Sequence, residues 1–280
     1  MLSLFLRFSL SAPNWKLAWS EEFDYTGLPN PKYWNYEVGF VRNTYSLYYT
    51  YADERTARVE NGNLVLEAHY DPNSTLPNGT VYQYTSGSII SKYKVDFLYG
   101  KLETRLKVPP GGGTWPAFWL KGSNFDEVGW PLCGEVDMME FIGNSPDTLW
   151  STFHMGGPNY PKDAEWSVGG TLTTKNASSI YHNYTFIWSN TSASMYIDNK
   201  FAVKYDRPAN DDIRTWPYDV PLYLLINFAI GGSWGGQVDN KIFDSEVKYY
   251  VDYIRYYIDL NDPLHEESYK VINANIARSS

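Results

Sequence analysis

The sequence predicts an all-β fold, an antiparallel β-sandwich, from three features. Strand-like runs rich in aromatic and β-branched residues recur along the chain. Turn signals such as Asn61-Gly62 and Gly231-Gly232 separate these runs at short intervals, and no helical stripe of convincing length interrupts them. With 280 residues, the chain is long enough to form one large β domain and to bury a substantial core.

The first segment of the chain, residues 1–12, carries several large apolar side chains interrupted by Arg7. It resembles a short or truncated signal peptide without a clean small-x-small cleavage site, and it is too short to span a bilayer. We therefore expect a signal or leader remnant over residues 1–13.

The rest of the chain is predicted to form a single domain over residues 14–260, because it contains no internal repeat and no linker. Polarity rises after Asp259, so we expect a C-terminal tail over residues 261–280, whose last part could instead form a trailing helix. Strands are expected at residues 181–188, 193–197 and 223–229, and loops that wall a cleft at residues 123–132 and 156–168.

One run, GEVDMMEFIG at residues 134–143, places three acidic side chains among five large apolar ones. Its apolar residues and flanking glycines predict a β-strand, in which side chains alternate between two faces. Strict alternation would put Glu135 and Asp137 on one face and bury Glu140 on the other, where an unpaired carboxylate is very costly. An extra residue in the methionine pair, a β-bulge, returns Glu140 to the acidic face.

The bulged strand also sets the spacing of the acids. Glu135 and Glu140 lie four pleats apart, roughly 13 Å between backbones, and their side chains can close this gap to about 5 to 6 Å. That separation is the one expected for the nucleophile and the acid/base of a retaining glycosidase. Because like charges this close cannot all stay ionised, at least one pKa should rise, as a general acid requires. The alternative is a solvated strand face whose acids take no part in chemistry.

This acidic run resembles the catalytic signature of glycoside hydrolase family 16, in the version with the extra bulge residue typical of laminarinase-like endo-β-1,3-glucanases. Other segments resemble the family in the same order, and together they cover about residues 15–258. They are the runs WSEEFD from Trp19, VENGNLVLE from Val59, YTSG from Tyr84, YGKLE from Tyr99, GTWPAFWL from Gly113, NFAIGGSW from Asn227 and VDYIRYY from Val251.

The resemblance implies catalytic roles for particular residues. Glu135 is expected to be the nucleophile, Glu140 the general acid/base, and Asp137 the residue that tunes the pair. His154 matches a histidine that faces this row from the neighbouring strand, although a structural histidine with satisfied hydrogen bonds is the alternative. The residues that match substrate-binding positions are Asn43, Trp115, Trp119 and Trp234. Each tryptophan taken alone could equally be a core residue.

The resemblance also implies a concanavalin-like jelly roll of two curved sheets, with the substrate cleft on the concave face and cleavage within a polymer chain. Catalysis is expected to need no cofactor. A structural calcium is implied as well, with Glu22 and Asp252 as candidate oxygen donors. The chain departs from the family at Tyr45, Leu47 and Ser88, where relatives commonly carry polar or charged residues. The reaction type is therefore better supported than the exact glucan.

Composition limits the partners of the protein. The formal net charge is −9 and Lys and Arg are dispersed, which argues against nucleic acid and anionic membranes but not against a neutral polysaccharide. The single cysteine, Cys133, cannot form an internal disulfide. We expect a monomer without membrane insertion that is secreted and acts outside the cell, where a polymeric β-glucan substrate lies. Asn-x-Ser/Thr sequons, for example at Asn73 and Asn190, are compatible with secretion.

Two alternative functions stay open. An agarase- or carrageenase-type galactan hydrolase, or a transglycosylase, would share the acidic signature. A sulfated substrate should call for a basic cleft, to which Arg42, Lys92 and Arg105 could contribute. From another class, a non-catalytic lectin-like glucan-binding protein would share the sandwich but would not need all three acids.

Overall fold

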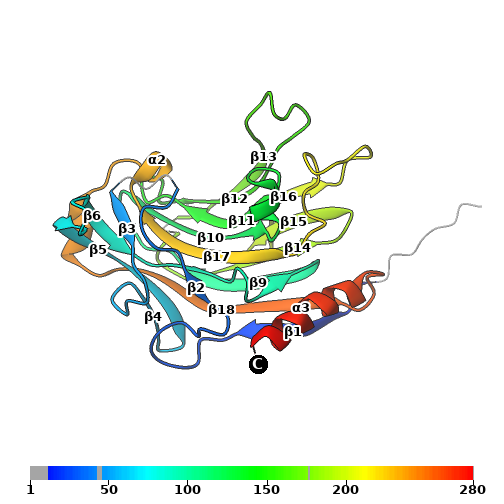
Figure 1. The fold of residues 1–280 in the computed structure, drawn as a ribbon, viewed down its shortest axis with the longest axis horizontal. Coiled ribbons are helices and arrows are strands. Elements are labelled where there is room, and N and C mark those ends of the chain that lie inside the picture. Colours follow the sequence, from blue (N-terminus) through cyan, green and yellow to red (C-terminus); the bar gives the residue numbers. More distant parts are fainter. Residues whose placement is uncertain (1–11, 43–45, 176, 280) are drawn as a thin grey trace, which may run out of the picture.

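The computed structural model describes residues 12–42, 46–175 and 177–279 of the chain. Over these residues the strands form two sheets, one of ten strands (the larger sheet) and one of eight (the smaller sheet). Figure 1 shows the central strands of the smaller sheet running side by side above β9 and β18 of the larger sheet. The described pairings are antiparallel except that of β3 with β6, which confirms the predicted antiparallel sandwich.

The larger sheet contains, in spatial order, β16 (Lys200–Asp206), β15 (Ser192–Ile197), β14 (His182–Trp188), β9 (Gly100–Lys107), β18 (Val247–Asp259), β5 (Asn63–Thr75), β6 (Val81–Ser86) and β3 (Leu47–Tyr49), with β1 (Trp15–Glu21) beside β18 and β4 (Ala57–Glu60) beside β5. The smaller sheet contains β13 (Trp166–Thr173), β12 (Thr148–Met155), β11 (Glu135–Phe141), β10 (Thr114–Gly122), β17 (Leu222–Ile230), β7 (Ser88–Ile90) and β2 (Asn35–Tyr36), with β8 (Asp96–Phe97) beside β17. The helices are α1 (Phe125–Val128), α2 (Gly232–Gly235), the 3₁₀ helix η1 (Asn240–Asp244) and α3 (His265–Ser279).

Two burial patterns explain how these strands pack. Buried and partly exposed residues alternate along β9 and β12, and the buried set, which includes Leu102 and Phe153, joins the core between the sheets. β17 is instead buried at every position. Two of its outward residues, Tyr223 and Leu225, form a second buried cluster with Ala117 and Trp119. Burial on both faces accounts for the continuous apolar run in this part of the sequence.

The remaining predicted elements are largely confirmed. Strands β14, β15 and β17 match the expected ranges to within one residue at each end. The first expected loop contains the single helical turn α1, and the second ends where β13 begins at Trp166. The leader expected over residues 1–13 lies almost wholly outside the described residues.

The C-terminal segment is a helix rather than a free tail. Helix α3 packs on the body of the protein through Ile272, which is 1% exposed, and the side-chain amide of Asn275 donates to the carbonyl of Asp96 in β8 at 2.8 Å. Of the two outcomes left open for this segment, the trailing helix is therefore the one found. Over the described residues, no helix has the length and apolar character needed to cross a membrane.

Candidate active site

Strand β11 carries the acidic run, and the structure confirms its bulge. Asp137 pairs with Thr152 of β12 and Glu140 pairs with Trp150, so a step of three residues on β11 faces a step of two on β12. The register with β10 shifts at the same point. Both methionines between the two acids are buried against the core. The bulge absorbs the extra residue and thus keeps Glu140 on the same face as Asp137, as the alternation argument predicted.

The three acids line one cavity of about 140 Å³ on the outer face of the smaller sheet. It is bounded by Arg42, Tyr49, Trp115, Ala117, Trp119, Glu135, Asp137, Glu140, Asn227 and Ala229. Carboxylates surrounded by aromatic faces suit a sugar ring, whose hydroxyls bind acids and whose C–H face packs on indole.

His154, on β12 opposite Glu135, links the row to the loop before β13. Its Nε2 lies 3.0 Å from Oδ2 of Asp137, and its Nδ1 lies 2.5 Å from Oε1 of Glu165. A carboxylate beside each ring nitrogen favours the positively charged imidazolium. His154 therefore contacts the catalytic row and is not an isolated structural histidine.

The electrostatics of the row favour bound protons. Burial raises the pKa of Glu135 to about 8, with the charge of Asp137 adding to the rise and His154 opposing it. Burial and Asp137 likewise raise the pKa of Glu140 well above its usual range. Burial alone would lower the pKa of His154, but the hydrogen bond and charge of Asp137 outweigh it and raise that pKa to about 10. The expected rise of at least one carboxyl pKa is thus found.

Glu135, Asp137 and His154 each offer a ligand atom within 4.8 Å of the others, which is close enough for a metal ion. The chemistry of the set points elsewhere, because a metal requires a neutral imidazole nitrogen. Here His154 forms ion pairs with Asp137 and Glu165, and these charges raise its pKa to about 10, which favours the protonated ring. The cluster is better described as carboxyl groups gathered around a protonated imidazole.

The three predicted tryptophans occupy different places. Trp115 on β10 lines the cavity and donates from Nε1 to Oε1 of Glu140 at 3.1 Å. Trp119 lines it too, is 5% exposed, and donates from Nε1 to Asn227 at 2.8 Å. Trp234 on α2 does not line the cavity, but its ring packs edge-on against Trp115 with centroids 5.9 Å apart. The ring of Trp234 also packs against Trp150, so Trp115, Trp150 and Trp234 form an aromatic cluster beside Glu140.

Asn43, the fourth predicted substrate-binding residue, lies outside the described residues. Its neighbour Arg42 lines the cavity, with its guanidinium 5.2 Å from the ring of Trp119 and its Nη1 2.6 Å from Oε1 of Glu37. The other two basic candidates pair with acids away from the cavity, Lys92 with Asp126 and Arg105 with Asp252.

The sequence did not identify three residues that contribute to this site, namely Asn227, Tyr49 and Glu165. Asn227 was part of a matched motif, and a polar residue within the apolar run of β17 is the signal that could have marked it. The hydroxyl oxygen of Tyr49 accepts a hydrogen bond from Nδ2 of Asn227 at 3.1 Å. Glu165 comes from a loop, where no periodicity predicts the direction of a side chain.

The calcium expectation is not supported by the placement of its two acids. Glu22 forms a two-pronged ion pair with Arg255, with N to O distances of 2.9 and 2.8 Å. Asp252 pairs with Arg105 at 2.5 Å. Each carboxylate is thus committed to a different arginine, whose charge would repel a cation. Residues so far apart in sequence gave no hint of these partners.

Comparison with known proteins adds an independent finding. A model of glycosyl hydrolases family 16 matches residues 44–255. A beta-glucanase of Rhodothermus marinus is 35% identical over 256 residues, which cover 88% of this chain and 86% of that protein. The solved laminarinase structure from the same organism is 34% identical, has a TM-score of 0.77, and is matched over 88% of this chain and 98% of its own.

A more distant match differs in its named substrate. The keratan-sulfate endo-1,4-beta-galactosidase of Sphingobacterium multivorum is 31% identical over 254 residues. These residues cover 89% of this chain but only 56% of that protein.

Proposed function

The chain belongs to glycosyl hydrolase family 16, and from this premise we propose that it is a retaining endo-hydrolase of β-1,3-glucan, the laminarin type. One observation carries the proposal: Glu135, Asp137 and Glu140 project from a single bulged strand into one aromatic-lined cavity.

The first chemical step uses the two outer acids. Glu140 gives its proton to the glycosidic oxygen while the carboxylate of Glu135 attacks the anomeric carbon, forming a glycosyl-enzyme bond. Burial and neighbouring charge, which raise the pKa of Glu140, keep that proton in place until the leaving group needs it. The imidazolium of His154 helps Glu135 to ionise, since it opposes the rise in the pKa of Glu135.

The second step needs Glu140 as a base. Once Glu135 is esterified its negative charge is gone, and the like-charge repulsion that it exerts on Glu140 goes with it. The pKa of Glu140 then falls, so its carboxylate can take a proton from the attacking water. Water enters from the side that the leaving group vacated, and the anomeric configuration is retained.

A neutral glucan fits the site better than a sulfated galactan. The cationic residue that lines the cavity, Arg42, is bound at 2.6 Å to Glu37, so its charge is largely compensated. A sulfate group would have to compete with that ion pair. The non-catalytic alternative is disfavoured because a binder would gain nothing from burying carboxylates beside one another.

The test is hydrolysis of laminarin, mixed-linkage glucan, agarose and carrageenan by purified protein, with product sizes followed over time. We expect laminarin to be cut fastest, with oligosaccharides appearing before glucose. Glu135→Ala should abolish hydrolysis while leaving polymer binding, and Asp163→Asn on the loop before β13 is the matched control. Full activity of Glu135→Ala would remove Glu135 as nucleophile, and faster cleavage of a galactan would replace the substrate.

A further inference from the structure

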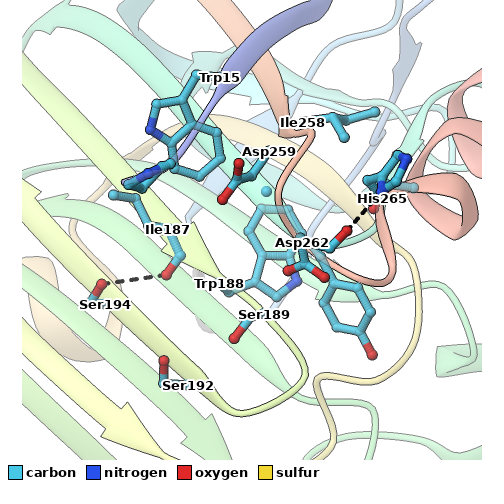
Figure 2. A pocket seen from close by; sticks show the side chains of 14 residues that line it. Trp15, Ile187, Trp188, Ser189, Ser192, Ser194, Ile258, Asp259, Asp262 and His265 are labelled. Atoms are coloured by element: carbon cyan, nitrogen blue, oxygen red, sulfur yellow. Dashed lines mark hydrogen bonds between the residues drawn. The ribbon is translucent and has the colours of Figure 1, made fainter. Parts of the chain in front are cut away.

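A second cavity lies on the larger sheet, and its polar groups are already satisfied. It has a volume of about 140 Å³, equal to that of the cavity lined by the three acids (the catalytic cavity), and it is bordered by β1, β14, β15, the end of β18 and the start of α3. Figure 2 shows Trp15, Trp188, Asp259 and Asp262 around it. Backbone N–H groups bind Oδ1 of Asp259 at 2.7 and 3.0 Å and Oδ1 of Asp262 at 2.8 Å, and both side chains are partly exposed to solvent. These aspartates therefore need no ligand.

A cation that the proposed mechanism does not use lies beside the catalytic cavity. Lys121, on β10, pairs with Glu135 of β11 on one side and with Tyr223 of β17 on the other. It comes two residues after Trp119, which lines the cavity, so both side chains project from the outer face of the smaller sheet. Lys121 is thus the immediate neighbour of the proposed nucleophile and of the cavity wall.

The ammonium of Lys121 contacts an aromatic ring but has no hydrogen-bond acceptor. Its Nζ lies 3.5 Å from the centroid of the Phe125 ring in α1 and 6.0 Å from that of Trp119. A ring face attracts a cation but occupies only one side of it. Lysine carries three N–H donors, and in the described parts of the chain no side chain or carbonyl accepts from those of Lys121.

This ammonium is also partly withdrawn from water. Burial lowers the pKa of Lys121, and negative neighbours, among them Glu135 and Glu37, offset the shift only in part. The side chain as a whole is half-buried. A partly desolvated cation without an acceptor is costly, so a ligand that supplies acceptor oxygens gains binding free energy from it.

The neighbouring charges favour a neutral acceptor. Burial would raise the pKa of Glu37, but Arg42 and Ser88 outweigh it and lower that pKa, so a carboxylate lies near Lys121. Glu135 must become a second carboxylate when it attacks the sugar. An anionic substituent such as a sulfate would be repelled by both. A sugar hydroxyl accepts a hydrogen bond without adding charge, so a neutral glycan suits this position.

We propose that Lys121 is a substrate-binding residue whose ammonium donates hydrogen bonds to hydroxyl groups of the glucan unit that lies beside Glu135. The choice of glucan rests on the proposed function, whereas the ammonium without an acceptor is a feature of the chain itself. A side chain without N–H donors at position 121 should therefore bind the same polymer less tightly.

The test measures binding in the full chain, in a Glu135→Ala background that prevents turnover. Isothermal titration calorimetry with laminaritetraose gives the affinity. Lys121→Met keeps a long side chain but removes the donors, and it should weaken binding about tenfold, the loss expected for one hydrogen bond to a charged group. Lys121→Arg keeps N–H donors and should recover most of that loss. Lys107→Met removes a lysine that lies over Tyr181 and Tyr250 on the larger sheet, and this matched control should leave the affinity unchanged.

Each other outcome has a definite meaning. If Lys121→Met binds laminaritetraose as tightly as its parent, or if Lys121→Arg loses as much affinity as Lys121→Met, the donor role is refuted and the proposed function stands. If a carrageenan tetrasaccharide binds more tightly than laminaritetraose and loses that advantage in Lys121→Met, the residue recognises an anion and the inference fails. If laminaritetraose does not bind even with Lys121 in place, the proposed glucan substrate fails and the inference falls with it. Lys121→Leu serves as the second variant should Lys121→Met fail to fold, as judged by circular dichroism.

Discussion

The two cavities have the same volume and the same kinds of lining, carboxylates beside tryptophan, but their carboxylates are held in different ways. In the smaller sheet, Glu135, Asp137 and Glu140 project from one strand and crowd together, and burial together with the charge of Asp137 raises the pKa of both glutamates. Beside α3, Asp259 and Asp262 are half-buried in a turn, where backbone N–H groups bind one oxygen of each. Acids and aromatic rings thus occur in both places, whereas acid/base chemistry requires the crowding that raises the carboxyl pKa values in the first.

The largest expected effect comes from removing the acid that must hold a proton. Glu140→Ala should lower kcat on laminarin by roughly 10²- to 10⁴-fold, the usual contribution of a general acid. On an aryl β-glucoside with a good leaving group, the rate of the first step should fall much less, because that leaving group needs no proton. Rapid-quench kinetics on both substrates measures this, with the exposed Glu246→Ala as control. Equal losses on both substrates would contradict the acid role.

The next effect concerns Glu165, which reaches the catalytic acids only through His154. Glu165→Ala should lower kcat/KM about tenfold, because the imidazolium loses a charged acceptor. The pKa of His154 should then fall from about 10, so activity should be lost at lower pH on the alkaline side. Glu165→Gln keeps a hydrogen-bond acceptor but carries no charge. It should therefore recover kcat/KM without restoring activity on the alkaline side of the pH profile. An unmoved pH profile in both variants would make Glu165 a purely structural residue.

A third effect should appear in stability. The folded state raises the pKa of Glu135 from 4.5 to about 8 and that of His154 from 6.5 to about 10, so it favours the protonated form of each. Stability from these groups is fully present below the unfolded pKa and is lost as pH rises through the folded one. The free energy of unfolding should therefore decline between about pH 5 and pH 10.

Glu135→Gln isolates the carboxylate part of that decline. It removes one buried charge beside Asp137 and should raise the free energy of unfolding at pH 8 by about 1 kcal/mol, while flattening the slope between pH 5 and 8. Urea unfolding at pH 5, 7 and 9 measures both. A variant whose stability follows pH as the unmodified protein does would show that the carboxylates of this cavity are not strained.

The smallest effect tests the hydrogen bond from Trp115 to Glu140. That bond stabilises the carboxylate and lowers the pKa of Glu140, against the burial that raises it. Trp115→Phe keeps an aromatic ring and removes the donor, so Glu140 should become a weaker donor of its proton, and kcat should fall about threefold. Because the pKa of Glu140 rises further, Trp115→Phe should also shift the pH optimum upward. Trp234→Phe, which alters the neighbouring ring but no bond to Glu140, should leave the pH optimum in place.

The sequence was informative wherever side-chain direction follows from periodicity. The two-residue period of a strand, together with the cost of burying an unpaired acid, was enough to predict the bulge in β11 and the common face of its three acids. The same period reveals β14 and β15, whereas a continuous apolar run reveals β17. Resemblance to a known family added His154 and the tryptophans, which no period marks.

The sequence did not reveal partners that come from distant or irregular parts of the chain. Arg255 is 233 residues from Glu22, so nothing local showed that this expected calcium ligand is already paired. Glu165 approaches His154 from a loop, whose backbone has no repeating direction. The C-terminal segment was ambiguous for a related reason: α3 owes its place to contacts such as that of Asn275 with Asp96, which are tertiary.

Strand β11 holds one residue more than its neighbours require. Between the pairs that flank the irregularity, β10 and β12 each advance by two residues, from Trp119 to Ala117 and from Thr152 to Trp150. Deleting one of the two methionines would bring all three strands into step and would still leave every acid facing outward, now at alternate positions. The extra residue is therefore not needed to turn the three acids outward. Its effect is local: the bulge increases the twist of the strand and changes the angle between the two glutamates that approach the sugar.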